Sequence, residues 1–408
     1  MKAKEILPIL LTCFALLRAS AAPSVGALKV EVLDTVKIHE VRKYGFFPSL
    51  QMLSTGELIC DFSLDADDLE VEANFWAYVV SKDLGRTWSM RNTGGMIYRE
   101  AAYTRDPALP DGSMLIVAGY PLPGPGDDYC NLETVSVRLS DGGNTSLFSR
   151  DVKIHLPRPA MRQRQSDNRK SFGVGKIKET ALMIFSGTIT AARDGGWLTT
   201  MYGKLEGDKF YRTIVVKSDP SGKNWNYLST IAGNETDPGI ADPAGEKSYE
   251  GPCEPRMIRL GDGRLFSVMR RGGNNLMSKA WSDDDGKTWT KPVSIGFRGV
   301  KPAMMEMKSG ILACSTGRPD SSAVRFSVDG GESWTDPTEV TKGSQVDARN
   351  SSGGQLRSTA YTGMVEVEAG KLLVVYDHLP FVEGWGLNPE TEPAAMNTIF
   401  GTFLRVGR

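Results

Sequence analysis

Ser282-Asp283-Asp284-Asp285-Gly286-Lys287-Thr288-Trp289 is a polar turn that ends in a tryptophan. The same pattern, Ser-x-Asp-x-Gly-x-Thr/Ser-Trp, occurs at residues 81–88 and again at 327–334. Average residue usage would produce such a match by chance on the order of once in a million windows. Three matches in one chain therefore indicate an internal repeat, and we call this eight-residue pattern the repeat turn.

The residue types of the repeat turn have a structural explanation. Ser and Asp side chains accept hydrogen bonds from nearby backbone N–H groups, and Gly adopts a positive φ without steric conflict. The closing Trp offers a large apolar surface to adjacent strands. We therefore expect each repeat turn to lock a β-hairpin, as a structural device and not as a substrate contact. Two degenerate copies lie at residues 218–225 and 141–146.

Between the turns the sequence has the pattern of short strands. Runs at 58–62, 114–118, 264–269, 311–315 and 371–376 follow Gly-bearing turns, and no long stretch after residue 22 has helical periodicity. Short strands with regular turn signals are typical of a propeller. Five turn copies and one further stretch predict an all-β, six-bladed β-propeller, in which the run at 28–39 completes the last blade.

The N-terminus has the features of an export signal. Lys2 and Lys4 precede an apolar run at 6–17, and the small residues at 19–22 offer a cleavage site. We expect residues 1–22 to be a signal peptide and residues 23–408 to be one propeller domain. The apolar run is too short for a stable membrane anchor, so the prediction is an exported, periplasmic or secreted protein.

Composition excludes several classes of partner. The net charge is −1, with 40% hydrophobic and 24% charged residues, so nucleic-acid or anionic-membrane binding has no support. The mature chain keeps four scattered cysteines (Cys60, Cys130, Cys253 and Cys314), which signal neither a disulfide framework nor a zinc site. We expect no metal, no cofactor and a monomer.

Two segments contain residues suited to catalysis. Tyr361 lies directly before an expected strand, and a tyrosine becomes a nucleophile only beside a base, because its free pKa is near 10. Glu254 lies between Cys253 and Pro255 at a strand entrance, followed by Arg270 and Arg271. The residues alone leave structural roles open: a salt bridge or hydrogen bond for Glu254, and core packing for Tyr361.

The repeat turns, the segment from Glu254 to Arg270 and Tyr361 before its strand together resemble the sialidase (neuraminidase) superfamily, six-bladed propellers with BNR or Asp-box turns. The resemblance covers nearly all of the mature chain. It implies a retaining glycosidase in which Tyr361 attacks the sugar and Glu254 takes its proton. It also implies an aspartate acid on a first-blade loop. Asp68 is our first candidate, with Asp67 and Asp65 as alternatives.

The family binds its substrate carboxylate with three arginines, because guanidinium groups make bidentate contacts. By resemblance Arg270, or adjacent Arg271, takes the second position. Arg318 is a candidate for the third, with Arg325 and Arg357 as competitors.

The first arginine of the family is absent. The chain has Phe46 where a Phe-Arg-Ile-Pro motif would place that arginine, and the nearest upstream cations are Arg42 and Lys43. An arginine-rich loop (Arg162, Arg164 and Arg169) is a second possible source of the cation, or a hydrated surface.

Three functions therefore remain at this level. The first is removal of terminal sialic acid or a related sugar from a glycan. The second is cleavage of a different uronic or neutral sugar on the same scaffold, which Phe46 favours. The third is a non-catalytic glycan-binding propeller, since fold alone does not decide function.

Overall fold

The computed structural model describes residues 28–41, 45–64, 76–93, 101–104, 109, 112–140, 145–164, 170–171, 175–176, 179–236, 249–272, 275–318, 321–341, 358–379, 382–383, 386–387 and 396–407. Within these ranges every regular element is a β-strand, so the all-β prediction is confirmed. The predicted signal peptide lies outside the described residues.

Four of the sheets have four strands each; three of them are meanders, and in the fourth the first strand of the chain pairs with the last. The first contains β2 (Phe46–Met52), β3 (Leu58–Ser63), β4 (Trp76–Ser81) and β5 (Ser89–Thr93). The next two are β19 (Cys253–Arg259), β20 (Leu265–Arg270), β21 (Ser278–Ser282) and β22 (Val293–Ser294), and then β23 (Val300–Glu306), β24 (Leu312–Gly317), β25 (Ala323–Ser327) and β26 (Thr338–Glu339). The fourth has the order β1 (Lys29–Val41), β31 (Asn397–Gly407), β28 (Lys371–His378) and β27 (Thr362–Glu368).

The middle of the chain departs from the expectation of separate blades. Here two antiparallel runs join into one nine-stranded sheet. The runs are β6 (Ala101–Thr104), β7 (Met114–Ala118), β9 (Asp128–Ser140) and β10 (Thr145–His155), and β15 (Met183–Ala191), β16 (Trp197–Gly203), β17 (Arg212–Ser218) and β18 (Asn224–Ala232). Parallel pairing of β6 with β15 and of β10 with β18 closes eight of these strands on themselves, and β8 (Leu122–Gly124) is added at the edge.

Three two-stranded sheets complete the described structure: β11 (Arg162–Arg164) with β14 (Glu179–Ala181), β12 (Lys170–Ser171) with β13 (Gly175–Lys176), and β29 (Val382–Glu383) with β30 (Gly386–Leu387).

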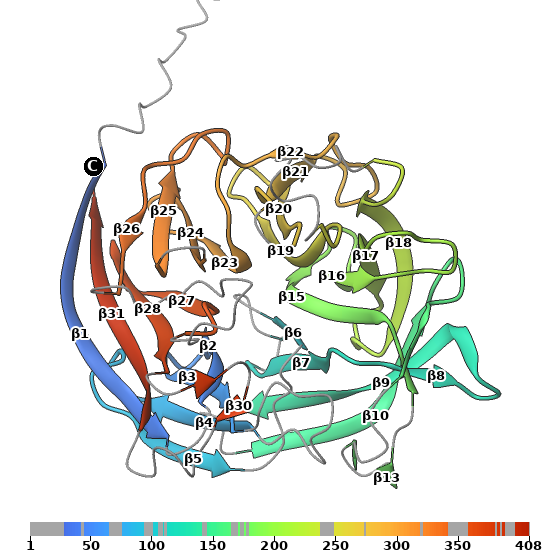
Figure 1. Cartoon of the computed structure of the whole chain (residues 1–408), viewed down its shortest axis with the longest axis horizontal. Coiled ribbons are helices and arrows are strands. Elements are labelled where there is room, and N and C mark those ends of the chain that lie inside the picture. The colour runs from blue at the N-terminus through green and yellow to red at the C-terminus, as the bar shows by residue number, and fades with distance from the viewer. Residues whose placement is uncertain are drawn as a thin grey trace, which may run out of the picture.

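The sheets follow one another around a common centre, in the order of the chain (Figure 1). The innermost strands β2, β27, β23, β19, β15 and β6 lie nearest that centre, and each contacts the next one in this order. The approach is close: a Cβ on Gly363 of β27 would lie 2.3 Å from the backbone N of Leu50 in β2. Glycine at this position therefore lets two inner strands touch.

The two ends of the chain close the ring. Strand β1 pairs antiparallel with β31 along most of its length, from Lys29 opposite Gly407 to Val41 opposite Asn397 (Figure 1). Strand β31 in turn pairs with β28. The prediction that the N-terminal run completes the last sheet is confirmed.

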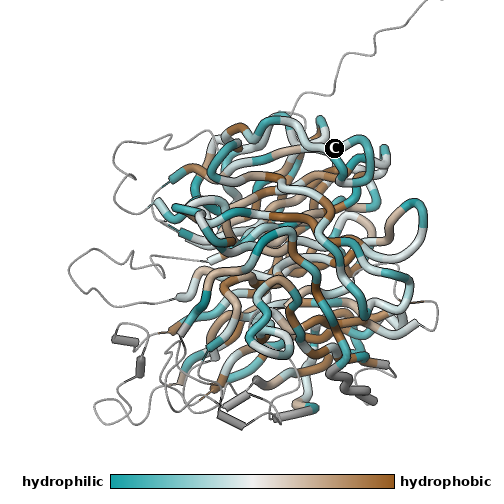
Figure 2. Tube along the Cα trace, turned by 90° about the vertical axis from the view of Figure 1, so that its right-hand side faces the viewer, coloured by the Kyte–Doolittle hydropathy of each residue, from teal (hydrophilic) through white to brown (hydrophobic). Residues whose placement is uncertain are grey.

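The apolar core lies between consecutive sheets. Phe62 and Phe403 share one cluster between the first and last sheets, and Phe266 belongs to another between the β19–β22 and β23–β26 sheets. The hydrophobic segments gather inside the body and the hydrophilic ones at its turns (Figure 2). Because these two clusters each join two sheets, burial fixes how those sheets pack against each other and holds their inner strands near the centre.

The repeat turns have the predicted geometry. In the copy at 282–289, Gly286 N donates to Ser282 Oγ (2.8 Å), Thr288 N donates to Asp284 Oδ1 (2.8 Å) and Trp289 Nε1 donates to Gly286 O (3.2 Å). The copies at 81–88 and 327–334 repeat these bonds. Each complete copy joins the third strand of its sheet to the fourth, so the hairpin prediction is confirmed.

Candidate functional site

A backbone kink recurs at the start of three inner strands. Phe47, Glu254 and Lys301 each have positive φ (58°, 42° and 37°) and each precedes a proline. At all three places the pairing with the next strand shifts register, as in a β-bulge. Positive φ is uncommon for such residues, and bulges of this kind occur next to active sites, where they redirect a side chain. The fold thus directs three side chains differently from the regular strand.

Tyr361 and Glu254 meet at this kinked end. The Tyr361 hydroxyl donates to Glu254 Oε1 (2.5 Å), although the two residues are far apart in sequence. Arg270, at the end of β20, donates from Nη1 to the same Oε1 (2.9 Å). Register explains this contact, because the pairing of Cys253 with Arg270 brings the end of β20 next to Glu254.

Lys301 completes the group. Its backbone N donates to Glu254 Oε2 (2.9 Å), and its ammonium lies 5.6 Å from the centre of the Tyr361 ring. Burial by itself would raise the pKa of Glu254, but the charges of Arg270 and Lys301 and the hydrogen bond from Tyr361 lower it to about 2. Burial opposes the charge on Arg270, and Glu254 nevertheless holds the pKa of Arg270 well above its usual value. Glu254 is therefore a carboxylate and Arg270 a cation at neutral pH.

Arg318 lies beside this group, immediately after β24. Its Nη2 donates to Thr359 O (3.3 Å) in the segment that leads to Tyr361. Burial and the nearby charge of Arg270 lower the pKa of Arg318 from its ordinary value. The structure thus brings together four of the predicted residues: Tyr361, Glu254, Arg270 and Arg318.

Other predicted arginines lie elsewhere. Arg271 is fully buried, with its guanidinium 5.3 Å from the Tyr249 ring. Arg270, and not Arg271, makes the contact with Glu254. Arg325 stacks on Phe297 at 4.4 Å, and Arg162 pairs with Glu179 at the surface.

Several predicted residues lie outside the described residues. They are the acid candidates Asp65, Asp67 and Asp68, the cations Arg42 and Lys43, and the competing Arg357 and Arg169.

Among the described residues, β2 itself contains no cation at the place of the missing first arginine. Phe46 is fully buried, and the neighbouring Phe47 places its ring 4.8 Å from the Tyr361 ring. That wall of the site is therefore aromatic. The third cation comes instead from Lys301 on β23, which the sequence reasoning missed. The recurring residue–proline pair at the start of a strand, in Phe47-Pro48, Glu254-Pro255 and Lys301-Pro302, was the signal that could have found it.

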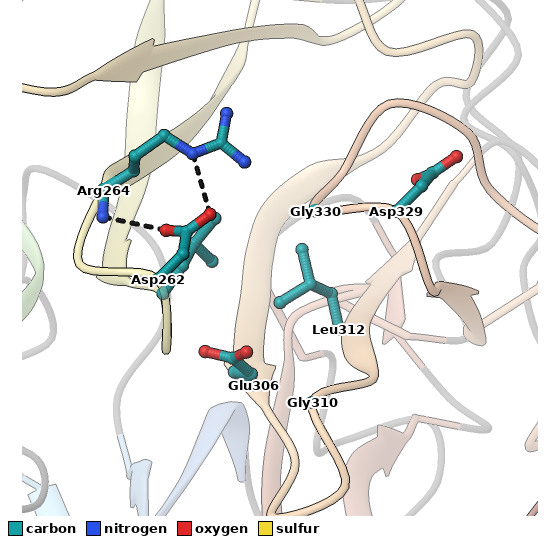
Figure 3. Close-up of a pocket in the computed structure, with 8 residues that line it drawn as sticks. Asp262, Arg264, Glu306, Gly310, Leu312, Asp329 and Gly330 are labelled. Carbon is teal, nitrogen blue, oxygen red and sulfur yellow. Dashed lines mark hydrogen bonds and ion pairs between the residues drawn. The ribbon is translucent and has the colours of Figure 1, made fainter. Parts of the chain in front are cut away.

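The opposite end of the strands has a different character. Ser282, which opens a repeat turn, pairs with Leu265 at the start of β20, whereas Arg270 lies at the other end of β20. Between the two neighbouring sheets at the turn end is a cavity of about 230 Å³ (Figure 3). Its lining includes Asp262, Glu306 and Asp329, and none of the predicted site residues. The repeat turns and this cavity are therefore remote from Tyr361.

Three further expectations concern metals, cysteines and membranes. In the described ranges no cluster of His, Cys, Asp and Glu is arranged to hold a metal ion. Cys60, Cys130, Cys253 and Cys314 are all unpaired thiols. No helix in the described part of the chain has the length and apolar character needed to cross a membrane.

The arrangement can activate a nucleophile. When a phenol oxygen bonds to a sugar carbon, its proton becomes strongly acidic, so even a carboxylate of low pKa can accept it. Glu254 is placed to receive that proton through the contact with Tyr361. Arg270, Arg318 and Lys301 surround the same point with positive charge, which favours an anionic group or developing negative charge.

Comparison with known proteins agrees with this architecture. The model of the "BNR repeat-like domain" family matches residues 160–374, more than half of the chain. No curated protein matches.

Solved structures share the fold at low identity. A protein of unknown function from Dyadobacter fermentans DSM 18053 is 17% identical, with a TM-score of 0.60 and coverage of 93% of this chain and 99% of its own. The Hadza microbial sialidase Hz136 is 15% identical (TM-score 0.56, coverage 90% and 66%). The α-L-arabinanase of Penicillium chrysogenum is also 15% identical (TM-score 0.56, coverage 91% and 98%). The chain thus shares its fold with these solved structures, among which are a sialidase and an arabinanase.

Proposed function

We propose that this chain, which belongs to the BNR repeat-like domain family, is an exported glycosidase of sialidase type that removes a terminal sialic acid or related sugar from glycans. The contact of the Tyr361 hydroxyl with Glu254 Oε1 is the observation that carries the proposal. A phenol hydrogen-bonded to a buried carboxylate beside a partly buried arginine has the composition of a nucleophile–base pair.

The proposed reaction is a double displacement. Tyr361 Oη bonds to the anomeric carbon as the glycosidic C–O bond breaks, and its proton passes to Glu254. An aspartate of the first-blade loop (Asp68, or Asp67 or Asp65) protonates the leaving oxygen. Water then attacks the same carbon as its bond to Tyr361 Oη breaks, that aspartate takes the proton of the water, and Glu254 returns its proton to Tyr361 Oη. The configuration of the sugar is retained.

A second candidate sugar follows from the aromatic wall. Phe46 stands where the family has an arginine and the Phe47 ring contacts Tyr361, so β2 supplies no bidentate clamp for a carboxylate. A different uronic or neutral sugar is therefore the alternative substrate, and both a sialidase and an arabinanase share the fold.

The wider setting is also part of the proposal. The two runs of the nine-stranded sheet would be the second and third blades of a six-bladed propeller. The chain would be exported after cleavage of residues 1–22, and would act on glycans as a monomer without metal.

The test compares the wild-type protein with Tyr361→Phe on a panel of fluorogenic sialosides, uronides and arabinofuranosides. We expect hydrolysis of at least one, with the anomer retained by NMR, and a loss of about 10²–10⁴-fold in kcat for the variant. Absence of hydrolysis across the panel, with binding of glycans preserved, would instead favour a non-catalytic glycan-binding propeller.

A further inference from the structure

Asp377 is a buried carboxylate directly behind the site. It lies on β28, is fully buried, and accepts four hydrogen bonds. Ser358 Oγ (2.6 Å), Thr359 N (2.9 Å) and Phe47 N (3.3 Å) donate to it, as does the Thr359 hydroxyl. All four donors belong to segments that contact Tyr361 or lead directly to it, so the carboxylate joins two sides of the site.

The bonds to Asp377 organise the turn that ends at Tyr361. Ser358 Oγ also accepts from Ala360 N (2.9 Å), and Thr359 Oγ1 accepts from Tyr361 N (3.4 Å). Ala360 has φ of +65° and is fully buried, a conformation that alanine rarely adopts unless its surroundings impose it. The hydroxyls that Asp377 holds therefore fix the backbone of the residues before Tyr361.

The same turn also carries a cation of the site. Thr359 O accepts from Arg318 Nη2 (3.3 Å), and Ala360 O accepts from Gly317 N (3.1 Å). On the other side, the Phe47 backbone bonds to Asp377 while the Phe47 ring contacts the Tyr361 ring. Movement of the Asp377 carboxylate would therefore displace Tyr361, Arg318 and Phe47 together.

We propose that Asp377 is a positioning residue, which sets the Tyr361 phenol against Glu254 and holds Arg318 at the site without touching substrate. The kinetic test of this inference rests on the proposed function. The positioning itself is a statement about the Tyr361 ring, and it can be tested without turnover.

The experiment uses Asp377→Asn and Asp377→Ala in the full chain, with Glu366→Gln as the matched control. Glu366 is also a nearly buried carboxylate, on the same strand as Thr362, and it accepts from Lys308 N (2.7 Å) and Gly370 N (2.8 Å) at the other end of that strand. Glu366→Gln thus also neutralises a carboxylate that holds two backbone segments by hydrogen bonds, but it leaves the turn before Tyr361 intact.

The first readout is 19F NMR of 3-fluorotyrosine placed at position 361. We expect one sharp resonance, at the same shift, for the parent protein and the Glu366→Gln variant, and a shifted or broadened resonance for both Asp377 variants. Asparagine keeps one acceptor oxygen, so Asp377→Ala should deviate more than Asp377→Asn. An unchanged resonance in folded Asp377→Ala would overturn the proposal.

The second readout is kinetic, on whichever glycoside the wild-type protein hydrolyses. We expect kcat to fall roughly 10- to 100-fold in Asp377→Asn with KM changed less than about threefold, because misplacement of a reacting group slows the chemical step. A fall in kcat equal to that of Glu366→Gln would count against positioning. If no glycoside is hydrolysed, the proposed function fails, and the 19F result still decides the role of Asp377.

If the Asp377 variants fail to fold, two milder variants test the same inference. Ser358→Ala and Thr359→Val each remove hydroxyl bonds to Asp377 and keep its charge. Each should shift the Tyr361 resonance by less than Asp377→Asn does, and no shift in either would refute the inference.

Discussion

Replacement of Glu254 by glutamine separates the catalytic charge from the shape of the site. On folding, the pKa of this carboxyl falls from 4.5 to about 2, because Arg270, Lys301 and the Tyr361 hydroxyl outweigh the effect of burial. At about 1.36 kcal/mol per pH unit, a fall of roughly 2.5 corresponds to about 3 kcal/mol of stability at pH 7. Removing one partner of a buried ion pair costs a similar amount, about 3–5 kcal/mol.

The sign gives the pH window. A carboxyl whose pKa is lowered by folding stabilises the protein above its unfolded pKa, here 4.5, and this contribution is lost as the pH falls towards 2. We therefore expect Glu254→Gln to unfold about 3 kcal/mol more easily than the wild-type protein at pH 7. The difference should shrink steadily below pH 4.5. In this variant Arg270 would keep only Glu250, at 3.6 Å, as a charged partner among the described residues.

The assays are urea unfolding at pH 7, 4 and 2.5, and hydrolysis of the substrate identified for the wild-type protein. Loss of the base should lower kcat by about 10²–10⁴-fold. Glu306→Gln is the control, since Glu306 lines the cavity at the turn end and accepts from Gly261 N. The reasoning is refuted if Glu254→Gln keeps wild-type turnover, or if its stability deficit is the same at every pH.

Three further outcomes are expected. Lys301→Met should raise KM at least about tenfold for a glycoside that carries a carboxylate and leave KM for a neutral glycoside unchanged, whereas Lys301→Arg should keep the preference for the acidic glycoside. Equal effects on both substrates would exclude an anion-binding role for Lys301. Asp61 is buried, and burial outweighs its hydrogen bond from Ser49 and raises the pKa of Asp61 from 3.8 to about 6. The wild-type protein therefore loses stability as the pH rises from about 4 to above 6. Over that window the free energy of unfolding of Asp61→Asn, measured in urea titrations, should rise by up to about 3 kcal/mol relative to the wild type. Asp284→Ala removes the bonds from Thr288 in a repeat turn and should cost about 1–2 kcal/mol in unfolding free energy with kcat unchanged; a lost kcat would contradict the separation of the turns from the site.

Local signals were enough for the elements of the fold. The strand expected at 114–118 is β7, and the run expected at 371–376 lies within β28. These predictions succeed because a strand between two Gly turns is specified by neighbouring residues. Pairing across the ring is not local. The parallel contacts of β6 with β15 and of β10 with β18 join the middle of the chain into one sheet, and no neighbouring residue signals them.

The residues of the site, too, were partly recognisable from the sequence and partly only from the packing. Residue type and strand entrance pointed to Tyr361 and Glu254 as candidates, and the resemblance to the sialidase superfamily pointed to Arg270. Lys301 was missed because a lysine before a proline looks like an ordinary surface residue. Arg270 and Arg271 could not be distinguished by sequence, since adjacent side chains of a strand point to opposite faces and only the packing shows which face is the site.

The sequence by itself determined that this protein is a repeat of β-hairpins, because the hydrogen bonds of each repeat turn close within eight residues. It also supplied a phenol, a carboxylate and several guanidinium groups. Only the tertiary structure decided that the phenol meets the carboxylate 107 positions away, at the kinked ends of inner strands that the closed ring holds together. That meeting depends on the packing between sheets and on a buried aspartate behind the site, and both are long-range properties of the folded chain.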